Sequence, residues 1–79
     1  MKNKWSYRYV KEIRNTPEFG QYLTYGLQVG RKTEEGYVLV ECIHDITVKQ
    51  QLAENLAEAF SRCQLSPIHF RDAVEDMLP

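Results

Sequence analysis

Apolar and polar side chains alternate along the first half of the chain. In residues 4–13 (KWSYRYVKEI) the odd positions are mostly aromatic or apolar, and in residues 22–29 (YLTYGLQV) all of them are. A period of two is typical of a strand with one buried face. Turn-forming residues at 15–17 separate these segments, and the polar, glycine-bounded loop 30–36 separates the second from a third strand at 37–44.

The third predicted strand, YVLVECIH, differs from the first two because it is apolar at both odd and even positions. One face carries Tyr37, Leu39 and Ile43, and the other carries Val38, Val40 and Cys42. A strand with one solvated face alternates instead. The pattern therefore predicts that something covers each face of this strand.

The spacing of apolar residues changes to three or four in the second half of the chain. Thr47 and Gln50 fit a capping box, which predicts a helix that begins at about Val48. Its apolar stripe consists of Val48, Leu52, Leu56, Phe60 and Cys63. The remaining positions are mostly polar, so we expect an amphipathic helix that lies on the sheet.

A second helix is predicted within LSPIHFRDAVEDML, residues 65–78. Ser66 is a favoured N-cap residue, and Pro67 suits the first helical position. The predicted buried stripe consists of Phe70, Ala73, Val74, Met77 and Leu78. The acidic residues between them then face solvent, which explains this charged cluster without a reactive site.

Together these segments predict an α+β fold, in which a three-stranded antiparallel β-meander is followed by two C-terminal helices packed on one face. We find no repeat and no linker, so residues 1–79 are expected to form a single small α+β domain. Ordering a chain of this size costs roughly 120 kcal/mol, which one small core must nearly offset alone. A homodimer would bury further apolar area and so help to offset this cost.

Composition and the N-terminus indicate the class of protein and its compartment. The chain is 43% hydrophobic and 27% charged, which excludes wholesale disorder. The first residues lack the apolar stretch of a secretory signal, and no run approaches the roughly 18 apolar residues of a membrane span. We therefore expect a cytoplasmic protein, in which Cys42 and Cys63 are reduced thiols.

Charge is distributed unevenly, although the net charge is −1. Residues 1–33 hold seven basic and two acidic side chains, for a net charge of +5, whereas residues 34–79 hold three basic and nine acidic ones, for −6. A basic sheet and acidic helices favour contact with another protein surface, including that of a second copy.

Several segments in this order resemble a known family. The strand YLTYGLQV, the glycine-bounded loop, YVLVECIHDIT, the amphipathic helix and LSPIHFRDAVEDML are similar to a family of small proteins of unknown function from Firmicutes, chiefly clostridia. The most specific part is Leu65 to His69, with the Arg-Asp and Glu-Asp pairs that follow. The resemblance implies a bacterial cytoplasmic protein and brings no catalytic assignment.

The sequence gives little support for a catalytic site or a metal site. Cys42 and His44 share a strand face, but side chains at that spacing lie roughly 6–7 Å apart, too far for a direct hydrogen bond. Together with Cys63 and His69, this pair would supply the two cysteines and two histidines of a tetrahedral zinc site. However, the predicted helix separates His44 from Cys63 by roughly 20 Å, too far for both to bind one ion. No phosphate-binding loop or nucleophile motif is present. We therefore predict a non-enzyme without metal or cofactor.

Two binding surfaces are predicted instead. A candidate docking corner between the helices consists of Leu65, Ile68, His69 and Arg71, where Leu65 and Ile68 would form an exposed apolar spot beside polar side chains. The function that follows is a non-catalytic protein-protein interaction or regulatory module, and a second copy is among the expected partners, which would give a homodimer. The alternative, that both apolar residues of this corner are buried, stays open.

Single-stranded nucleic-acid binding is the alternative function. Its candidate face consists of Trp5, Tyr7, Arg8, Tyr9 and Lys11. Aromatic sheet faces flanked by cations stack bases in several unrelated folds. However, strand aromatics more often form a core, and the chain is not basic overall. We therefore expect a protein partner more than a nucleic acid, and no membrane contact.

Overall fold

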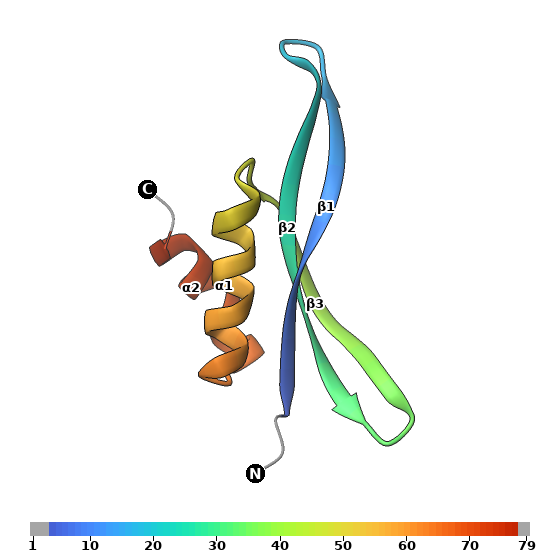
Figure 1. Cartoon of the computed structure of the whole chain (residues 1–79), viewed down its shortest axis with the longest axis vertical. Coiled ribbons are helices and arrows are strands. Elements are labelled where there is room, and N and C mark those ends of the chain that lie inside the picture. Colours follow the sequence, from blue (N-terminus) through green and yellow to red (C-terminus); the bar gives the residue numbers. More distant parts are fainter. Residues whose placement is uncertain (1–3, 78–79) are drawn as a thin grey trace.

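The computed structural model describes residues 4–77, which form three strands followed by two helices. The elements are β1 (Trp5–Thr16), β2 (Gly20–Thr33), β3 (Gly36–Thr47), α1 (Gln50–Arg62), the single 3₁₀ turn η1 (Pro67–His69) and α2 (Phe70–Met77). The sheet order is β1-β2-β3, and both neighbouring pairs are antiparallel. The predicted α+β fold is confirmed. Figure 1 shows both helices on one side of the sheet and the tip of the β2–β3 hairpin pointing away from them.

The strands extend further than the sequence predicted, because most of the expected loop 30–36 is strand. β2 continues to Thr33 and β3 begins at Gly36, which leaves Glu34 and Glu35 as a two-residue turn. Gly36 has a φ of 132°, a conformation that residues with a side chain rarely adopt. Polar residues suit the solvated end of a hairpin as well as a loop, and this made the boundary hard to predict.

The helices cover the odd residues from Trp5 to Tyr9 of β1 and from Tyr25 to Val29 of β2, as the alternation predicted, whereas Ile13 and Leu23 near the β1–β2 turn are exposed. The core cluster consists of Tyr7, Leu27, Val29, Leu56, Ala57, Phe60, Phe70 and Val74. The Tyr7 ring packs edge-on against Phe60 and Phe70, with ring centroids 5.5 and 5.2 Å apart. Its hydroxyl donates a hydrogen bond to the Leu65 carbonyl (2.6 Å), and burial raises the pKa of Tyr7 to about 12.

The predicted start of the first helix is wrong by about two residues. The Thr47 hydroxyl accepts a hydrogen bond from the N–H of Lys49, so it does not cap the helix from the expected position. The Gln50 side chain does not complete a capping box either, because its amide donates to the Tyr9 hydroxyl (3.3 Å). Val48 is accordingly exposed rather than part of the buried stripe, and so is Cys63 at the other end of the helix.

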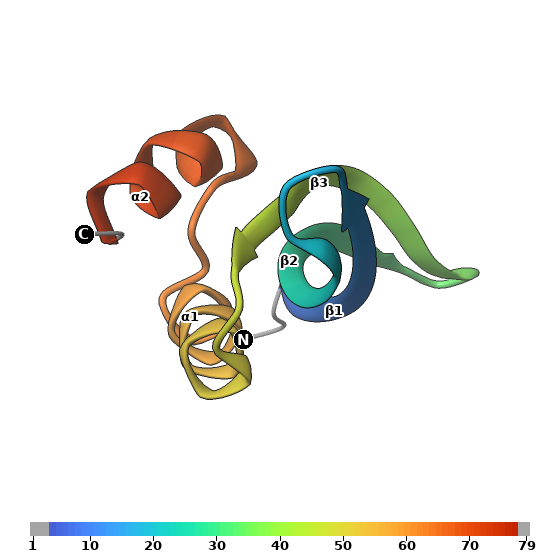
Figure 2. The ribbon, with the colours of Figure 1, turned by 90° about the horizontal axis from the view of Figure 1, so that it is seen from above.

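The second helical segment is divided in two. Pro67 opens η1 rather than α2, and the Ser66 side chain makes no capping hydrogen bond. In α2, Phe70 and Val74 are buried as predicted, whereas Met77 is exposed. The predicted stripe member Leu78 lies outside the described residues. Figure 2 shows α2 beside α1 and away from the β2–β3 hairpin.

The helices leave one face of the sheet uncovered, and we call it the open face. On this face, a glycine in the central strand β2 makes room for a side chain of β3 to cross to β1. Tyr37 of β3 lies over Gly30, and its hydroxyl donates a hydrogen bond to the Ser6 carbonyl of β1 (3.2 Å). A Cβ atom on Gly30 would lie 2.1–2.5 Å from three atoms of this ring. The guanidinium of Arg8 lies over the same ring, 4.2 Å from its centroid. Gly30 therefore allows the two edge strands to be joined across β2.

Replacing Gly30 should therefore destabilise the fold only while the Tyr37 ring is present. We expect Gly30→Ala to lower the free energy of unfolding by about 1–3 kcal/mol, because the ring must leave its place. In a Tyr37→Ala background the same change should be neutral or should stabilise by about 0.5–1 kcal/mol, since alanine is less costly than glycine in a strand. Urea unfolding of the four proteins measures this cycle, and equal effects in both backgrounds would contradict the crossing.

Candidate functional site

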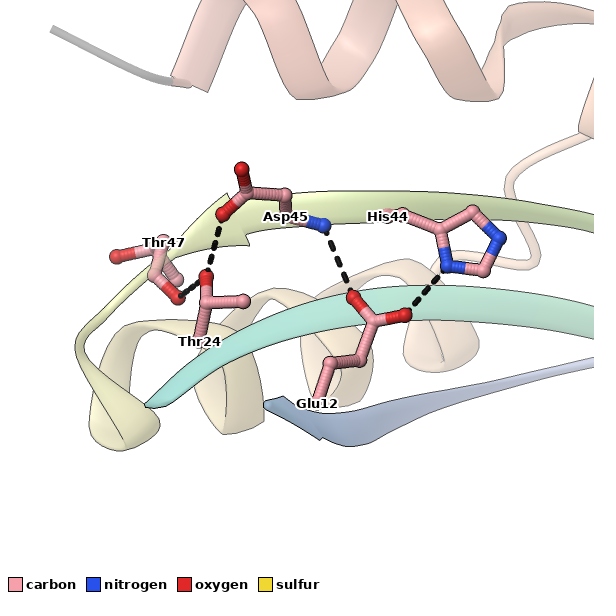
Figure 3. Close-up of polar contacts among 5 residues, drawn as sticks. All are labelled: Glu12, Thr24, His44, Asp45 and Thr47. Carbon is pink, nitrogen blue, oxygen red and sulfur yellow. Dashed lines mark hydrogen bonds and ion pairs between the residues drawn. The ribbon is translucent and has the colours of Figure 1, made fainter. Parts of the chain in front are cut away.

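A polar bridge joins β1 to β3 on the open face (Figure 3). Glu12 crosses β2 above Gly26, where its Oε2 lies 2.5 Å from Nδ1 of His44 and its Oε1 accepts a hydrogen bond from the N–H of Asp45 (3.0 Å). A Cβ atom on Gly26 would lie 3.1 Å from this carboxylate and 2.5 Å from the carbonyl oxygen of Ile43. Gly26 thus provides the space for the bridge, as Gly30 does for Tyr37.

Asp45 extends the bridge back to β2. Its backbone is left-handed, with a φ of 52°, which Asp tolerates better than most residues. Its carboxylate accepts hydrogen bonds from the hydroxyls of Thr24 (2.8 Å) and Tyr22 (3.1 Å). Thr24 is fully buried, and its hydroxyl also lies 3.0 Å from the carbonyl oxygen of Thr47. The polar groups around the end of β3 are therefore satisfied, and the irregular backbone is held in place.

The electrostatics of the bridge favour an ionised Glu12. Burial alone raises the pKa of Glu12, but the hydrogen bonds from His44 and from the N–H of Asp45 outweigh it and lower that pKa below its usual value. A pocket of about 330 Å³ lies beside the pair and is lined by Glu12, Ile13, Arg14 and His44. The Glu12 carboxylate orients the His44 ring, which is more than half exposed.

Cys42 does not complete a nucleophilic site with His44. Burial, and then the negative charge of Glu12, raise the pKa of the Cys42 thiol, which is the opposite of what a reactive thiolate requires. His44 directs its Nδ1 to Glu12 instead. Sequence reasoning considered Cys42 with His44 but missed Glu12, because only the strand register brings residues 32 positions apart together.

The predicted docking corner is only partly exposed. Leu65 is half-buried and packs against the core, where its carbonyl accepts the Tyr7 hydrogen bond. Ile68 is 81% exposed, and His69 and Arg71 are also exposed. Ile68 is therefore the apolar side chain that the corner presents to solvent, beside two polar ones.

The residues predicted to bind nucleic acid lie on opposite sides of the sheet. Tyr7 is buried beneath the helices, and Trp5 and Tyr9 are partly buried against the same core. Arg8 points to the open face, whereas Lys11 is exposed beyond the core. The aromatic stripe is the hydrophobic face of β1, so the helices occupy the place that stacked bases would need.

The outer edge of β1 is covered by side chains from the end of α1. The Ser61 hydroxyl accepts a hydrogen bond from the N–H of Tyr7 (2.9 Å) and lies 3.2 Å from the carbonyl oxygen of the same residue. The Gln64 amide accepts from the N–H of Trp5 (2.8 Å) and donates to its carbonyl (2.9 Å). These two polar side chains occupy the positions that a neighbouring strand would take.

Gln64 reaches the strand because the chain turns sharply after α1. Its backbone is left-handed, with a φ of 52°, and the N–H of Leu65 donates to the carbonyl of Phe60 (3.1 Å). This is the hydrogen bond of a Schellman helix end. Glycine is the usual residue at such a position, so the sequence contained no clear signal for it.

The outer edge of β3 is open near the β2–β3 turn. Val38, Leu39 and Val40 follow one another and are 54%, 54% and 48% exposed. Val38 pairs with Arg31 and Leu39 with Gly30, so these two neighbours point to opposite faces of the sheet. A bulge follows Leu39 in the pairing with β2. All three side chains keep about half of their surface exposed, and we call this segment, Val38 to Val40, the β3 apolar edge.

Two further properties concern the described residues alone. Among residues 4–77, no three histidine, cysteine, aspartate or glutamate side chains lie together in a way that could hold a metal ion. Neither of the helices in this part of the chain is long and apolar enough to cross a membrane.

Comparison with known proteins identifies a family. The chain matches, over residues 1–79, the model of a family described as Family of unknown function (DUF6514), and it belongs to that family. No curated protein and no solved structure matched the chain. The resemblance to a family of unknown function is thereby confirmed, whereas an origin in Firmicutes stays a prediction.

The polar bridge should make stability depend on pH in the acid range. Because folding lowers the pKa of Glu12, its contribution is present above the unfolded value of 4.5 and is lost as the pH falls through the folded value. We expect Glu12→Gln to cost about 1–3 kcal/mol at pH 7 and less at pH 3. Unfolding by urea at each pH measures the difference, and a cost that does not change with pH would contradict an ionised bridge.

Proposed function

We propose that this protein is a non-catalytic interaction module that receives a strand of a protein partner along the outer edge of β3. The observation that carries this proposal is the β3 apolar edge, where three consecutive apolar side chains are about half exposed. Apolar residues on an open edge strand are uncommon, because such an edge readily pairs with another chain. Where an edge is exposed in this way, an extended segment can add to it by main-chain hydrogen bonds.

The two edges of the sheet differ in how they are protected. The edge of β1 is covered by Ser61 and Gln64 at the same end of the sheet. The segment Tyr37–Val40 contains no charged residue and no proline, which are two of the devices that prevent edge pairing, and the bulge after Leu39 is the one such device that it has. The tip of the β2–β3 hairpin points away from the helices (Figures 1 and 2). The helices pack against the other end of β3, around Ile43 and Ile46, and they leave the β3 apolar edge near the hairpin turn exposed.

The orientation of the exposed residues favours a strand over a surface that covers one face. Val38 and Leu39 point to opposite faces. A partner helix or sheet packed on one face would leave the other residue in water. An added strand alternates its own side chains and therefore contacts both faces of its neighbour.

The Glu12–His44 pair and Cys42 support a non-catalytic function. The pair holds the end of β3 in place, and the thiol has a raised pKa. The nucleic-acid alternative has less support, because Tyr7 is buried and Trp5 and Tyr9 pack against the core. The docking corner around Ile68 remains a second protein-binding surface to compare with β3.

Matched substitutions can locate the surface that binds a partner. We expect Leu39→Lys to abolish capture of partner proteins from a nuclease-treated lysate of the native host, because a lysine opposes burial of the edge. Phe19→Lys, at an exposed position (78%) in the β1–β2 turn, should capture as the unchanged protein does. Circular dichroism should show that both variants fold. Quantitative mass spectrometry of the captured proteins provides the measurement.

Three results would contradict the proposal. Equal capture by Leu39→Lys would exclude the β3 apolar edge. Loss of capture with Ile68→Lys alone would place the docking surface at the corner between the helices. Loss of all captured proteins on nuclease treatment would favour single-stranded nucleic-acid binding instead.

A further inference from the structure

We infer that the strand received by β3 is β3 of a second copy, paired antiparallel with Leu39 of both copies at the two-fold axis. This inference rests on the proposed function, and it adds the identity of the partner and the register of the pairing. Homodimers are most often related by a two-fold axis, which places the same patch on both sides of the interface. A two-fold axis perpendicular to the sheet, placed at a strand edge, pairs that strand with its own copy in the antiparallel direction.

The apolar segment is self-complementary about Leu39. In this register Leu39 lies opposite its own copy, and Val38 lies opposite Val40 of the other protomer. Glu41, the one charged residue in segment 37–43, then lies opposite Tyr37. All three residues of the β3 apolar edge therefore face apolar residues across the interface, and cross-strand pairs of this kind stabilise a sheet.

Charge disfavours the neighbouring registers. An axis at Val38 would place Glu35 opposite Glu41, and an axis at Glu41 would place that carboxylate opposite its own copy. An axis at Val40 would place Leu39 opposite Glu41. Like charges directly opposite one another destabilise a strand pair, as does an unpaired charge among apolar residues. An axis at Leu39 avoids these arrangements, because Glu41 then lies opposite Tyr37, whose ring carries the Arg8 guanidinium.

The whole molecule is compatible with self-association. The net charge of −1 gives little repulsion between two copies. The paired edge would give partners to outward-facing N–H and C=O groups of β3, which receive no hydrogen bond from the helices in residues 4–77. The bulge after Leu39 limits the length of regular pairing, so we expect a small interface and a weak, concentration-dependent dimer.

Sedimentation velocity between about 10 μM and 1 mM tests the dimer. We expect the unchanged protein and Phe19→Lys to shift from monomer to dimer over this range. Leu39→Lys should weaken association at least about tenfold, because two lysines would meet at the axis. Circular dichroism of each variant shows whether the fold is retained.

Disulfide trapping tests the register in a background with Cys42→Ser and Cys63→Ser, after sedimentation has shown that this background still dimerises. Leu39→Cys should form an intermolecular disulfide on mild oxidation, since Cα atoms directly opposite in an antiparallel pair lie about 4.5–5.5 Å apart. Val38→Cys alone should not, because the two copies of residue 38 are offset along the strands. A mixture of Val38→Cys and Val40→Cys chains should form the mixed disulfide.

The outcomes separate this inference from the proposed function. A protein that stays monomeric to 1 mM, yet loses capture of another protein with Leu39→Lys, would overturn self-pairing and leave the edge as a site for a different partner. A dimer that persists in Leu39→Lys would also overturn self-pairing through β3. A monomer whose capture is unaffected by Leu39→Lys would overturn both. Efficient trapping of Val38→Cys alone would contradict the register.

Discussion

The hydrogen bonds of Ser61 and Gln64 to the backbone of β1 determine which parts of this protein are open. They fasten the end of α1 to one edge of the sheet, beside the aromatic residues that α1 and α2 bury. A sheet of three strands has two edges, and the helices cover part of one. The other edge, β3, is left with apolar residues in water. The proposed function follows from this asymmetry.

The open face has a complementary role. Glycines in β2 allow Glu12 and Tyr37 to cross the central strand, and these side chains join the two edge strands directly. The end of β3 near α1 is held by the polar bridge, whereas the β3 apolar edge lies towards the hairpin turn. An edge strand held in this way is already ordered before a partner strand binds. Less conformational entropy is then lost on association.

The sequence predicted the fold class well because period-two and helical spacings reflect which side chains must be buried. It also identified β3 as apolar on both faces, although residues 4–77 cover only the part around Ile43 and leave Val38 to Val40 about half exposed. The contacts that it missed depend on register or on unusual backbone conformations. Glu12 meets His44 only because β2 places them side by side, and Gln64 reaches β1 only from a left-handed turn. The expected aromatic platform of Tyr7 and its neighbours became the core, because the same pattern describes a binding face and a buried one.

Hydrogen exchange of individual amides, followed by NMR at low and high protein concentration, tests the central claim most directly. We predict that the amides of Trp5 and Tyr7, which donate hydrogen bonds to Gln64 and Ser61, are protected at both concentrations. The outward-facing amides between Tyr37 and Glu41 should exchange quickly in dilute solution and become protected as the concentration rises. Protection of these β3 amides in dilute solution, or rapid exchange at every concentration, would contradict an open edge that pairs with a second copy.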